Sequence, residues 1–420
     1  MTTHGFRRSP RPVKGWSRLA ALALLLSCGG CGGGGGFGPD NLYISVETST
    51  NSGGSVELGA NRTIGRRLIE KFRTLNPDVA VHVSHFPVGE LLPATRFRDS
   101  RGLGPDLIVS RVITALQLHQ QGLSSDVSLK QEGLDRLQPR FLRSFRKGSR
   151  VFAVPFLAQP QVACYDRRRL KNPPRSLDEL LALSARGLRV GLPLGVGEIY
   201  WTTTAQGAGQ AVARLLDGPP QPTPTTLSAA DREALERWIA WLHNASLQQN
   251  ISFSDDPLDL VEQLQRGERD WISCTSLWID GLRQRMGPHL GVSVLPGAAE
   301  APATPITRLL VWSFGRHSSA RQRQVAERFV AFSLNEVTQK QLMEVVPGNL
   351  PVNPNVLIPT RSSALMAALS SSLDHSLMFD LRDPDGAIAR GMRLEAVLKK
   401  VVQGELLPAP ALAQLLAPTP

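Results

Sequence analysis

The segment Leu42-Tyr43-Ile44-Ser45-Val46 opens the alternation of strand and helix patterns that decides the fold class. Its β-branched and aromatic residues predict a strand. Residues 64–75 then place large apolar side chains at spacings of 4, 4 and 3, which predicts a helix with one apolar face. Asn76-Pro77-Asp78 ends this helix, and the alternating apolar residues of 79–83 predict a second strand.

The same alternation continues downstream. Residues 106–109 predict a third strand, and residues 114–121 predict a helix that ends before Gly122. Because strands alternate with helices, the sequence predicts an α/β fold with a mainly parallel sheet that helices cover on both faces.

Polar residues follow two of these predicted strands. Thr48 and Ser49 come after the first strand, and Ser110 and Arg111 come after the third. In open α/β sheets, ligands bind at the carboxyl ends of the strands. These four residues are therefore candidate ligand contacts, with ordinary polar loop residues as the alternative interpretation.

A second α/β unit begins near residue 155. Ser176-Leu177-Asp178-Glu179 has the capping-box pattern with which many helices begin. The strands predicted in the rest of the chain cover residues 162–165, 188–192, 271–274 and 292–297, and the helices cover residues 177–185, 228–243, 258–266 and 320–334.

The start of the chain has the pattern of an export signal and a tether. In residues 1–27, five basic residues precede a short apolar run, as in a secretory signal peptide. Leu25-Leu26-Ser27-Cys28 is similar to a bacterial lipobox, in which the chain is cut before a cysteine that receives lipid. The alternative is an ordinary signal peptide with an incidental cysteine. Residues 28–41 are rich in glycine and predict a flexible tether behind a lipid anchor at Cys28.

The other cysteines do not form a metal-binding pattern. Cys31 lies in the tether, and Cys164 and Cys274 lie in the globular part without CxxC or Cys/His spacing. In an oxidising compartment, Cys164 and Cys274 are able to pair. The sequence leaves this pairing open.

The composition is that of a globular protein. The chain has 420 residues, 42% of them hydrophobic, with 47 basic and 36 acidic residues. Five of the basic residues belong to residues 1–27, and no basic block is interleaved with aromatic residues, so no nucleic-acid partner is expected. The sequence contains no run of 18 apolar residues, so it predicts no membrane-spanning helix.

The sequence lacks the common catalytic and metal-binding motifs. His82 and His85 lie three residues apart on a predicted strand, so they face opposite sides and do not chelate one ion. Ser144-Phe145-Arg146-Lys147 matches SxxK but has no companion motif. Asp383-Pro384-Asp385-Gly386 resembles part of a calcium loop whose first and last ligand positions hold apolar residues. We therefore expect a binding protein with no catalytic residue, metal or cofactor.

Seven short segments, in order, make the chain similar to the extracellular solute-binding proteins of ABC importers, in the sugar-binding group that includes maltose-binding protein. Each segment is weak alone, but together they span about residues 42–410. They are Leu68–Phe72 with Asn76–Val79, Gly104–Ile108, Phe152–Pro155, Pro173–Leu180, Ser293–Gly297, Ala326–Phe332 and Gly348–Asn353.

The resemblance implies a two-lobed periplasmic-binding-protein fold with three crossings of the chain between the lobes, near Val154, Leu295 and Pro347. The N-terminal lobe is expected to comprise residues 42–154 with 297–346. The C-terminal lobe is expected to comprise residues 155–296 with 347–420.

The resemblance also implies a set of sugar contacts. Glu198, Tyr200 and Trp201 follow a predicted strand and are similar to an acidic-aromatic segment of the family. Trp278 is similar to the tryptophan that lines the family's cleft, and Gln159 completes the candidate set. Aromatic rings stack on sugars and carboxylates pair with hydroxyls, whereas core packing is the alternative role for the three aromatic residues. Only 6% of the residues are aromatic, which favours a small sugar or polyol.

The expected function is that of a substrate-binding lipoprotein. It would capture a sugar or small polyhydroxylated solute between its lobes and deliver it to the permease subunits of an ABC importer. We expect a monomer, exported and anchored by lipid at Cys28. One alternative is an anionic or amino-acid-like solute, with Arg111 as its partner. Another is an exported lipoprotein with a hydrolytic or scaffolding role.

Overall fold

Two β-sheets organise the part of the chain that the computed structural model describes, which is residues 40–48, 54–129, 131–217, 227–299, 301–378, 381 and 383–417. Cys28, the expected signal peptide and Ser49 lie outside the described residues. The first strand already begins at Asp40, so the globular part starts slightly earlier than expected. No helix among the described residues combines the length and apolar character needed to cross a membrane.

The first sheet takes strands from three separate stretches of the chain. They are β1 (Asp40–Thr48), β2 (Val79–Pro87), β3 (Leu107–Arg111), β4 (Ser124–Ser125), β7 (Val154–Gln159), β13 (Arg308–Gly315) and β14 (Leu350–Pro351). The strand order is β14-β7-β13-β3-β1-β2, and β4 also pairs with β13. β1 is parallel to β2 and β3, whereas β13 is antiparallel to β3 and β7. The sheet is therefore mixed rather than mainly parallel as predicted, because the late strand β13 enters it in the opposite direction.

The second sheet is also mixed. Its strands are β8 (Gln161–Asp166), β9 (Val190–Pro193), β10 (Ile251–Ser254), β11 (Trp271–Thr275) and β12 (Leu290–Ser293). The order is β10-β9-β11-β8-β12, with β9 parallel to β10 and β11, and β8 antiparallel to β11 and β12. A separate short hairpin pairs β5 (Arg146–Lys147) with β6 (Arg150–Val151).

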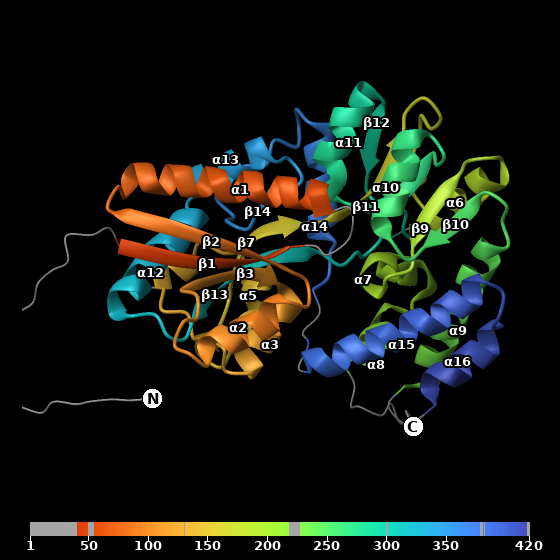
Figure 1. Cartoon of the computed structure of the whole chain (residues 1–420). Coiled ribbons are helices and arrows are strands. Elements are labelled where there is room, and N and C mark those ends of the chain that lie inside the picture. The colour runs from red at the N-terminus through yellow and green to blue at the C-terminus, as the bar shows by residue number, and fades with distance from the viewer. Residues whose placement is uncertain are drawn as a thin grey trace, which may run out of the picture. The chain divides into compact units, whose positions relative to one another are not determined.

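Helices flank both sheets (Figure 1). The α-helices are α1 (Gly54–Leu75), α2 (Leu91–Asp99), α3 (Val112–Gln120), α4 (Gln131–Leu134), α5 (Pro139–Leu142), α6 (Leu177–Ala185), α7 (Val196–Ile199), α8 (Gly209–Asp217), α9 (Ala229–Ser246), α10 (Pro257–Arg266), α11 (Ile279–Met286), α12 (Ala320–Leu334), α13 (Glu336–Val345), α14 (Ala364–Asp374), α15 (Pro384–Val402) and α16 (Pro408–Leu416). Short 3-10 helices are η1 (Arg143–Phe145), η2 (Tyr200–Gln206), η3 (Ser276–Trp278) and η4 (Gly287–His289).

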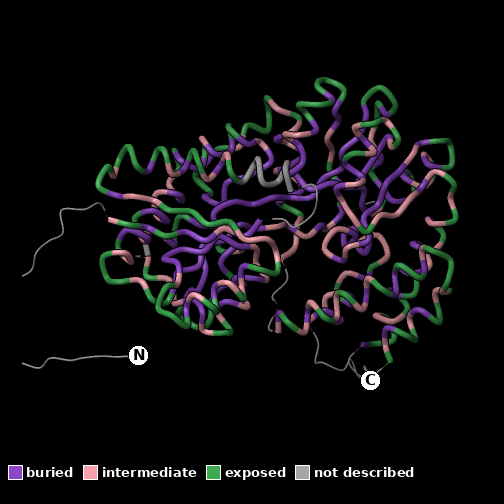
Figure 2. Tube along the Cα trace, in the orientation of Figure 1, coloured by how far each residue is buried: buried purple, intermediate pink, exposed green. Residues whose placement is uncertain are grey.

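The predicted α/β class is confirmed, because alternate residues of a strand pack against helices on opposite faces. In β3, Leu107 and Val109 join the large core cluster that includes Phe72 of α1. Ile108 lies between them in sequence and packs with Leu91 and helix α3 on the other face. Figure 2 shows the buried residues concentrated along the strands and the exposed residues along the outer sides of the helices.

Helix boundaries agree best where a capping side chain is present. α6 begins after Ser176, whose Oγ accepts a hydrogen bond from the backbone N–H of Glu179 at 3.2 Å. The carboxylate of Glu179 accepts from the backbone N–H of Arg175, so only half of the predicted capping box forms. The segment Asp383–Gly386, which resembles part of a calcium loop, starts a helix in the same way. Asp383 caps α15 by accepting a hydrogen bond from the backbone N–H of Gly386.

The chain crosses between the sheets three times, and two crossings lie further along the sequence than expected. β7 starts at Val154 but pairs with β13 and β14, so the first crossing falls at Pro160. The last crossing follows Pro351, because β14 still pairs with β7, and α14 then contacts β8 and β12. The expected positions near Val154 and Pro347 came from the family resemblance, but the backbone ladder of the first sheet continues past them. The second crossing lies in the gap between β12 and β13.

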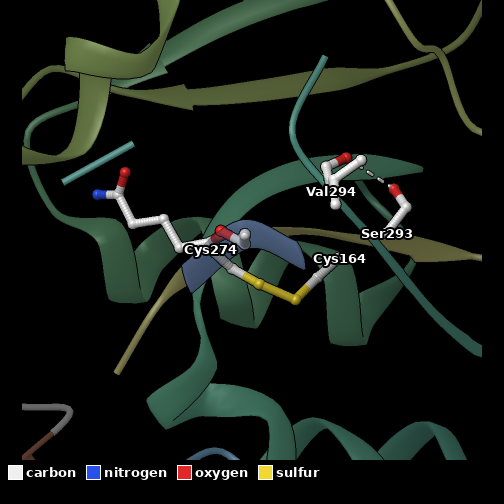
Figure 3. The surroundings of a disulfide bond; sticks show 6 residues. Cys164, Cys274, Ser293 and Val294 are labelled. Atoms are coloured by element: carbon white, nitrogen blue, oxygen red, sulfur yellow. Dashed lines mark hydrogen bonds between the residues drawn. A yellow bond between two sulfur atoms is a disulfide. The ribbon is translucent and has the colours of Figure 1, made fainter. Parts of the chain in front are cut away.

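Cys164 in β8 and Cys274 in β11 form a disulfide with a Cα–Cα distance of 6.0 Å (Figure 3). The two strands are antiparallel neighbours, in which Cys164 lies opposite Ile272 and Cys274 lies opposite Val162. This neighbour relation brings together two residues that are 110 positions apart in sequence. The pairing that the sequence left open is therefore made in the structure.

Candidate functional site

One buried carboxylate, that of Glu47, connects the carboxyl ends of β1 and β3. Its Oε2 accepts from the backbone N–H of Arg111 at 2.9 Å and lies 3.4 Å from Nε of the same residue. Its Oε1 accepts from the Oγ1 of Thr114 at 2.7 Å. The Arg111 side chain keeps 36% of its surface exposed. Its charge is thus balanced within the protein, and a bound anion would compete with Glu47 for it.

The other candidates on these two strands differ in accessibility. Thr48 is buried and donates from Oγ1 to the carbonyl of Phe86 at 3.1 Å, which links β1 to β2. Ser110 is also buried, and its Oγ has no hydrogen-bond partner among the described residues. The neighbouring strands β1 and β3 bring Thr48 and Arg111 to the same edge of the sheet. Their ligand contacts stay a prediction.

A second group of polar residues lies where the two sheets meet. Gln159, the last residue of β7, is buried and donates from Nε2 to the Oδ1 of Asn349 at 2.8 Å. Gln161, the first residue of β8, donates from Nε2 to the carbonyl of Gly197 at 2.7 Å. We call this group the junction cluster, which consists of Gln159, Gln161, Glu198, Ser276, Arg308 and Asn349.

Ser276 links the first crossing of the chain to the segment just before β14. Its backbone N–H donates to the carbonyl of Pro160 at 2.9 Å, and its Oγ donates to the carbonyl of Gly348 at 2.5 Å. Gly348 approaches the Ser276 carbonyl so closely that a Cβ would collide with it. A glycine is required here for the two segments to touch.

An ion pair joins the two sheets at the junction cluster. Arg308 lies at the start of β13, directly opposite Gln159 of β7. Its guanidinium pairs with the carboxylate of Glu198, which α7 carries just after β9. The side chains keep 27% and 18% of their surfaces exposed, so the pair lies at the edge of the protein interior rather than within it.

Four buried polar atoms in and beside the junction cluster have no hydrogen-bond partner among the described residues. They are Oε1 of Gln161, Nδ2 of Asn349, Oγ1 of Thr275 and Oγ1 of Thr307. Thr275 lies opposite Gln161 in the β8–β11 ladder, and Thr307 precedes Arg308. Buried donors and acceptors are nearly always paired in proteins, so these four atoms are candidate contacts for a polar partner.

The predicted aromatic contacts are mostly buried. Tyr200 is 4% exposed, and its hydroxyl donates to the carbonyl of Gly209 at 2.9 Å. Burial raises the pKa of Tyr200 to about 12. Trp201 is fully buried and lies 6.2 Å from Trp271 between ring centroids, inside the core of the second sheet. This position favours core packing for Trp201, the alternative role that the sequence left open.

Trp278 has a different environment from Trp201. It ends η3, directly after β11, and keeps 7% of its surface exposed. It packs in the core cluster that also includes residues of the first sheet, and η3 contacts α1. Trp278 therefore lies near the boundary between the two sheets, and its ligand contact stays a prediction.

Sequence reasoning missed four members of the junction cluster, namely Gln161, Ser276, Arg308 and Asn349. Asn349 belongs to the Gly348–Asn353 segment that carried the family resemblance, but it was not assigned a role. Arg308 was missed because β13 was not predicted. The apolar run Leu309–Trp312 is a signal for a buried strand that would have indicated it.

Glu395 of α15 adds a titratable group behind Glu198. Its Oε1 accepts from the backbone N–H of Val196 at 2.7 Å. Burial raises the pKa of Glu395, the Val196 N–H opposes this shift, and the charges of Glu198 and Asp255 add to it.

Replacing Glu395 with glutamine is therefore expected to stabilise the protein relative to the wild type as the pH rises. A carboxyl whose pKa is raised by folding contributes stability below its unfolded pKa, and that contribution is lost as the pH rises through the folded pKa. Glutamine keeps an acceptor for Val196 but does not ionise. Denaturant unfolding of both proteins at about pH 4 and about pH 7 measures the difference. Glu236→Gln, at an exposed position of α9, is the control. A Glu395→Gln variant that loses stability relative to the wild type over this range would show that the sign is wrong.

The described part of the chain contains no group of three His, Cys, Asp or Glu side chains arranged to hold a metal ion. The chain passes three times between the two sheets, which meet at a polar junction. This arrangement is that of a two-lobed binding protein. Residues 67–367 match the family model of the bacterial extracellular solute-binding proteins, and the chain belongs to this family. The resemblance based on seven segments is thereby confirmed, and family membership makes the chain an exported protein. No curated protein has a matching sequence.

Solved structures of this kind share the fold. The GacH receptor of Streptomyces glaucescens, solved unliganded and with acarbose, has a TM-score of 0.70 and 17% identity over 90% of this chain and 96% of its own. The maltose/maltodextrin-binding domain MalE of Bdellovibrio bacteriovorus, bound to maltotriose, has a TM-score of 0.68 and 16% identity over 90% and 97%. MalE of Listeria monocytogenes, in complex with maltose, has a TM-score of 0.66 and 16% identity over 90% and 96%.

Proposed function

We propose that this protein captures a sugar or small polyhydroxylated solute between its two sheets and delivers it to the permease of an ABC importer. The family supplies the binding role, and structures with the same fold hold acarbose, maltose or maltotriose. The solute would be released unchanged, because the proposed role is binding without turnover.

The unpaired polar atoms at the junction are the observation that supports a sugar as the ligand. Two hydroxyls, one amide oxygen and one amide nitrogen lack partners there. This is a neutral mixture of donors and acceptors, and sugar hydroxyls are able to act as both. A neutral polyol would satisfy these groups without introducing an uncompensated charge.

We assign the ligand contacts to the junction cluster and Trp278, with Glu198 as the hydroxyl-pairing carboxylate. Arg111, Thr48, Ser49 and Ser110 are proposed for the opposite wall. Tyr200 and Trp201, both buried in the core of the second sheet, would support the wall that carries Glu198 from behind.

The balanced charge of Arg111 bears on the anionic alternative. A carboxylate or phosphate ligand would have to displace Glu47, which is itself buried and would lose its charged partner. Leaving a buried charge unpaired costs several kcal/mol, so the Glu47–Arg111 pair favours a neutral ligand.

Closure of the two lobes on the ligand would follow from contacts to both sheets. The Arg308–Glu198 pair already connects the sheets, so a ligand hydroxyl that pairs with Glu198 would also be held next to Arg308.

Replacing Glu198 with glutamine is expected to weaken sugar binding by about tenfold or more, because hydrogen bonds to a charged group contribute about 1.5–3 kcal/mol. Isothermal titration with the best-binding sugar of a panel of maltose, maltotriose and acarbose measures the change. Glu236→Gln is the matched control. Equal affinity of Glu198→Gln and the wild type would remove Glu198 from the site, and loss of the sugar itself during the titration would contradict binding without turnover.

We also propose that Cys28 is the mature N-terminal residue and carries lipid. The lipobox-like segment before it supports this assignment. Cys28→Ala is expected to move the protein from the membrane fraction to the soluble fraction or to leave an uncleaved precursor. Cys31→Ala, three residues away, is the control and should stay in the membrane fraction. A mature N-terminus at another residue without acyl groups, found by mass spectrometry, would contradict the anchor.

A further inference from the structure

A cavity of about 650 Å³ lies between α1 and the first sheet. Its floor is the sheet face that carries Ile44, Val109 and Trp312. None of the six residues of the junction cluster lines it, although Glu47, the partner of Arg111, does. Its size is within the range of about 300–1,000 Å³ that is usual for small-molecule sites.

Aromatic side chains pack against one another on the sheet side of the cavity. Phe156 stacks on Trp312 with 4.7 Å between ring centroids, and Trp312 meets Phe329 edge to face at 5.6 Å. On the helix side, the lining includes Gly65, and a Cβ added there would have no atom within 4 Å. The helix therefore leaves a gap above an aromatic floor.

The opening of the cavity lies between α1 and the edge strand β2. Val79, Val81 and Val83 alternate onto one face of β2. Val79 is only 2% exposed, whereas Val83, which lines the cavity, is 37% exposed. Helix α1 thus covers the start of the strand and leaves its end open to solvent.

The charges around this opening are predominantly positive. Arg62, Arg66 and Arg73 of α1 line the cavity, and their spacings of four and seven residues place them on one side of the helix. Within the described part of the chain, the side chains of these three arginines make no hydrogen bond or ion pair. The two acidic residues of the lining, Glu47 and Glu70, are paired with other arginines.

His85 adds no charge to the opening at neutral pH. Burial and the nearby positive charge of Arg62 lower the pKa of His85, so its imidazole is neutral there. The unbalanced charge at the opening therefore comes from the arginines of α1.

We propose that this cavity binds a single-chain anionic amphiphile of the fatty-acid class. The hydrocarbon chain would lie on the aromatic floor beneath Gly65, where its burial is favourable. The carboxylate would lie at the opening and pair with Arg62 and Arg66. This site is independent of the sugar-binding proposal.

The test titrates the purified full-length protein with dodecanoate by calorimetry and with 12-bromododecanoate by tryptophan fluorescence. We expect saturable one-to-one binding, with bromine quenching that decreases in Trp312→Phe. Gly65→Leu fills the cavity and is expected to weaken dodecanoate binding at least tenfold. Gly391→Leu, in helix α15, is the matched control and should leave the affinity unchanged. Val83→Trp blocks the opening from a half-exposed strand position and provides a second variant should Gly65→Leu fail to fold.

The charge of the ligand is tested separately. The double substitution Arg62→Gln, Arg66→Gln is expected to weaken dodecanoate binding about tenfold and to leave the binding of dodecanol unchanged. Absence of saturable dodecanoate binding to the wild type would overturn the proposal. Undiminished binding to both Gly65→Leu and Val83→Trp would also overturn it, because the amphiphile would then bind elsewhere. Maltotriose titrations of the same variants report on the sugar site and should not change.

Discussion

Replacing Cys164 and Cys274 together with alanine is expected to lower the free energy of unfolding by about 4–5 kcal/mol. The disulfide closes a loop of 110 residues, and in the chain-entropy model a loop of about 100 residues contributes about 4.7 kcal/mol. Both cysteines are buried, and the strands that carry them, β8 and β11, each have a neighbouring strand on both sides. The substitution therefore also leaves a small cavity. Denaturant unfolding of the double variant and the wild type measures the loss.

Reduction of the wild type provides the control for this prediction. A reductant should lower the stability of the wild type toward that of the double variant and leave the double variant unchanged. Two free thiols in the native, oxidised wild-type protein, or equal stability of the two proteins, would contradict the disulfide.

Replacing Trp201 with alanine is expected to lower the free energy of unfolding by about 3–5 kcal/mol, as is usual for a large aromatic side chain removed from a core. Trp201 has no exposed surface and packs against Trp271 within the core of the second sheet. The sugar affinity of the folded fraction should change little. Unfolding curves and sugar titrations of the same variant separate the two effects.

Leu247→Ala is the control for stability, because Leu247 is 70% exposed. It should change the free energy of unfolding by less than about 0.5 kcal/mol. A Trp201→Ala protein with unchanged stability and a several-fold lower sugar affinity would restore Trp201 to the ligand-binding wall and contradict the assignment to the core.

The parts of the fold that depend on local patterns were predictable from the sequence. Helix α12 agrees residue for residue with the predicted range 320–334, because Ser319 caps it and its apolar residues recur at helical spacing. The strands β1, β2 and β3 also followed from local patterning. Their parallel arrangement came from the alternation with helices.

The features that depend on strand order were not predictable. β13 and β14 enter the first sheet from far along the chain, and no local pattern specifies which strand they pair with. For the same reason the sequence left the pairing of Cys164 with Cys274 open, although the β8–β11 ladder brings them together.

The candidate site shows the same division between local and long-range information. Glu198 and Trp278 were proposed because each follows a predicted strand and is similar to a sugar-binding position of the family. The place of Trp201 after a predicted strand does not determine that its side chain faces the core. The direction of this side chain depends on how η2 packs against α9 and β11. Arg308 and Asn349 join the junction through long-range contacts with Glu198 and Gln159.

The most direct test of the proposed function is a titration of the purified protein with two classes of solute. One class contains neutral sugars, namely maltose, maltotriose and acarbose, together with monosaccharides and polyols. The other contains amino acids and inorganic phosphate. We expect saturable one-to-one binding of at least one neutral sugar or polyol, with a rise in melting temperature that increases with ligand concentration, and no binding of the second class. Saturable binding of an amino acid or phosphate, with no binding of any sugar or polyol, would contradict the assignment of a sugar-binding site at the junction.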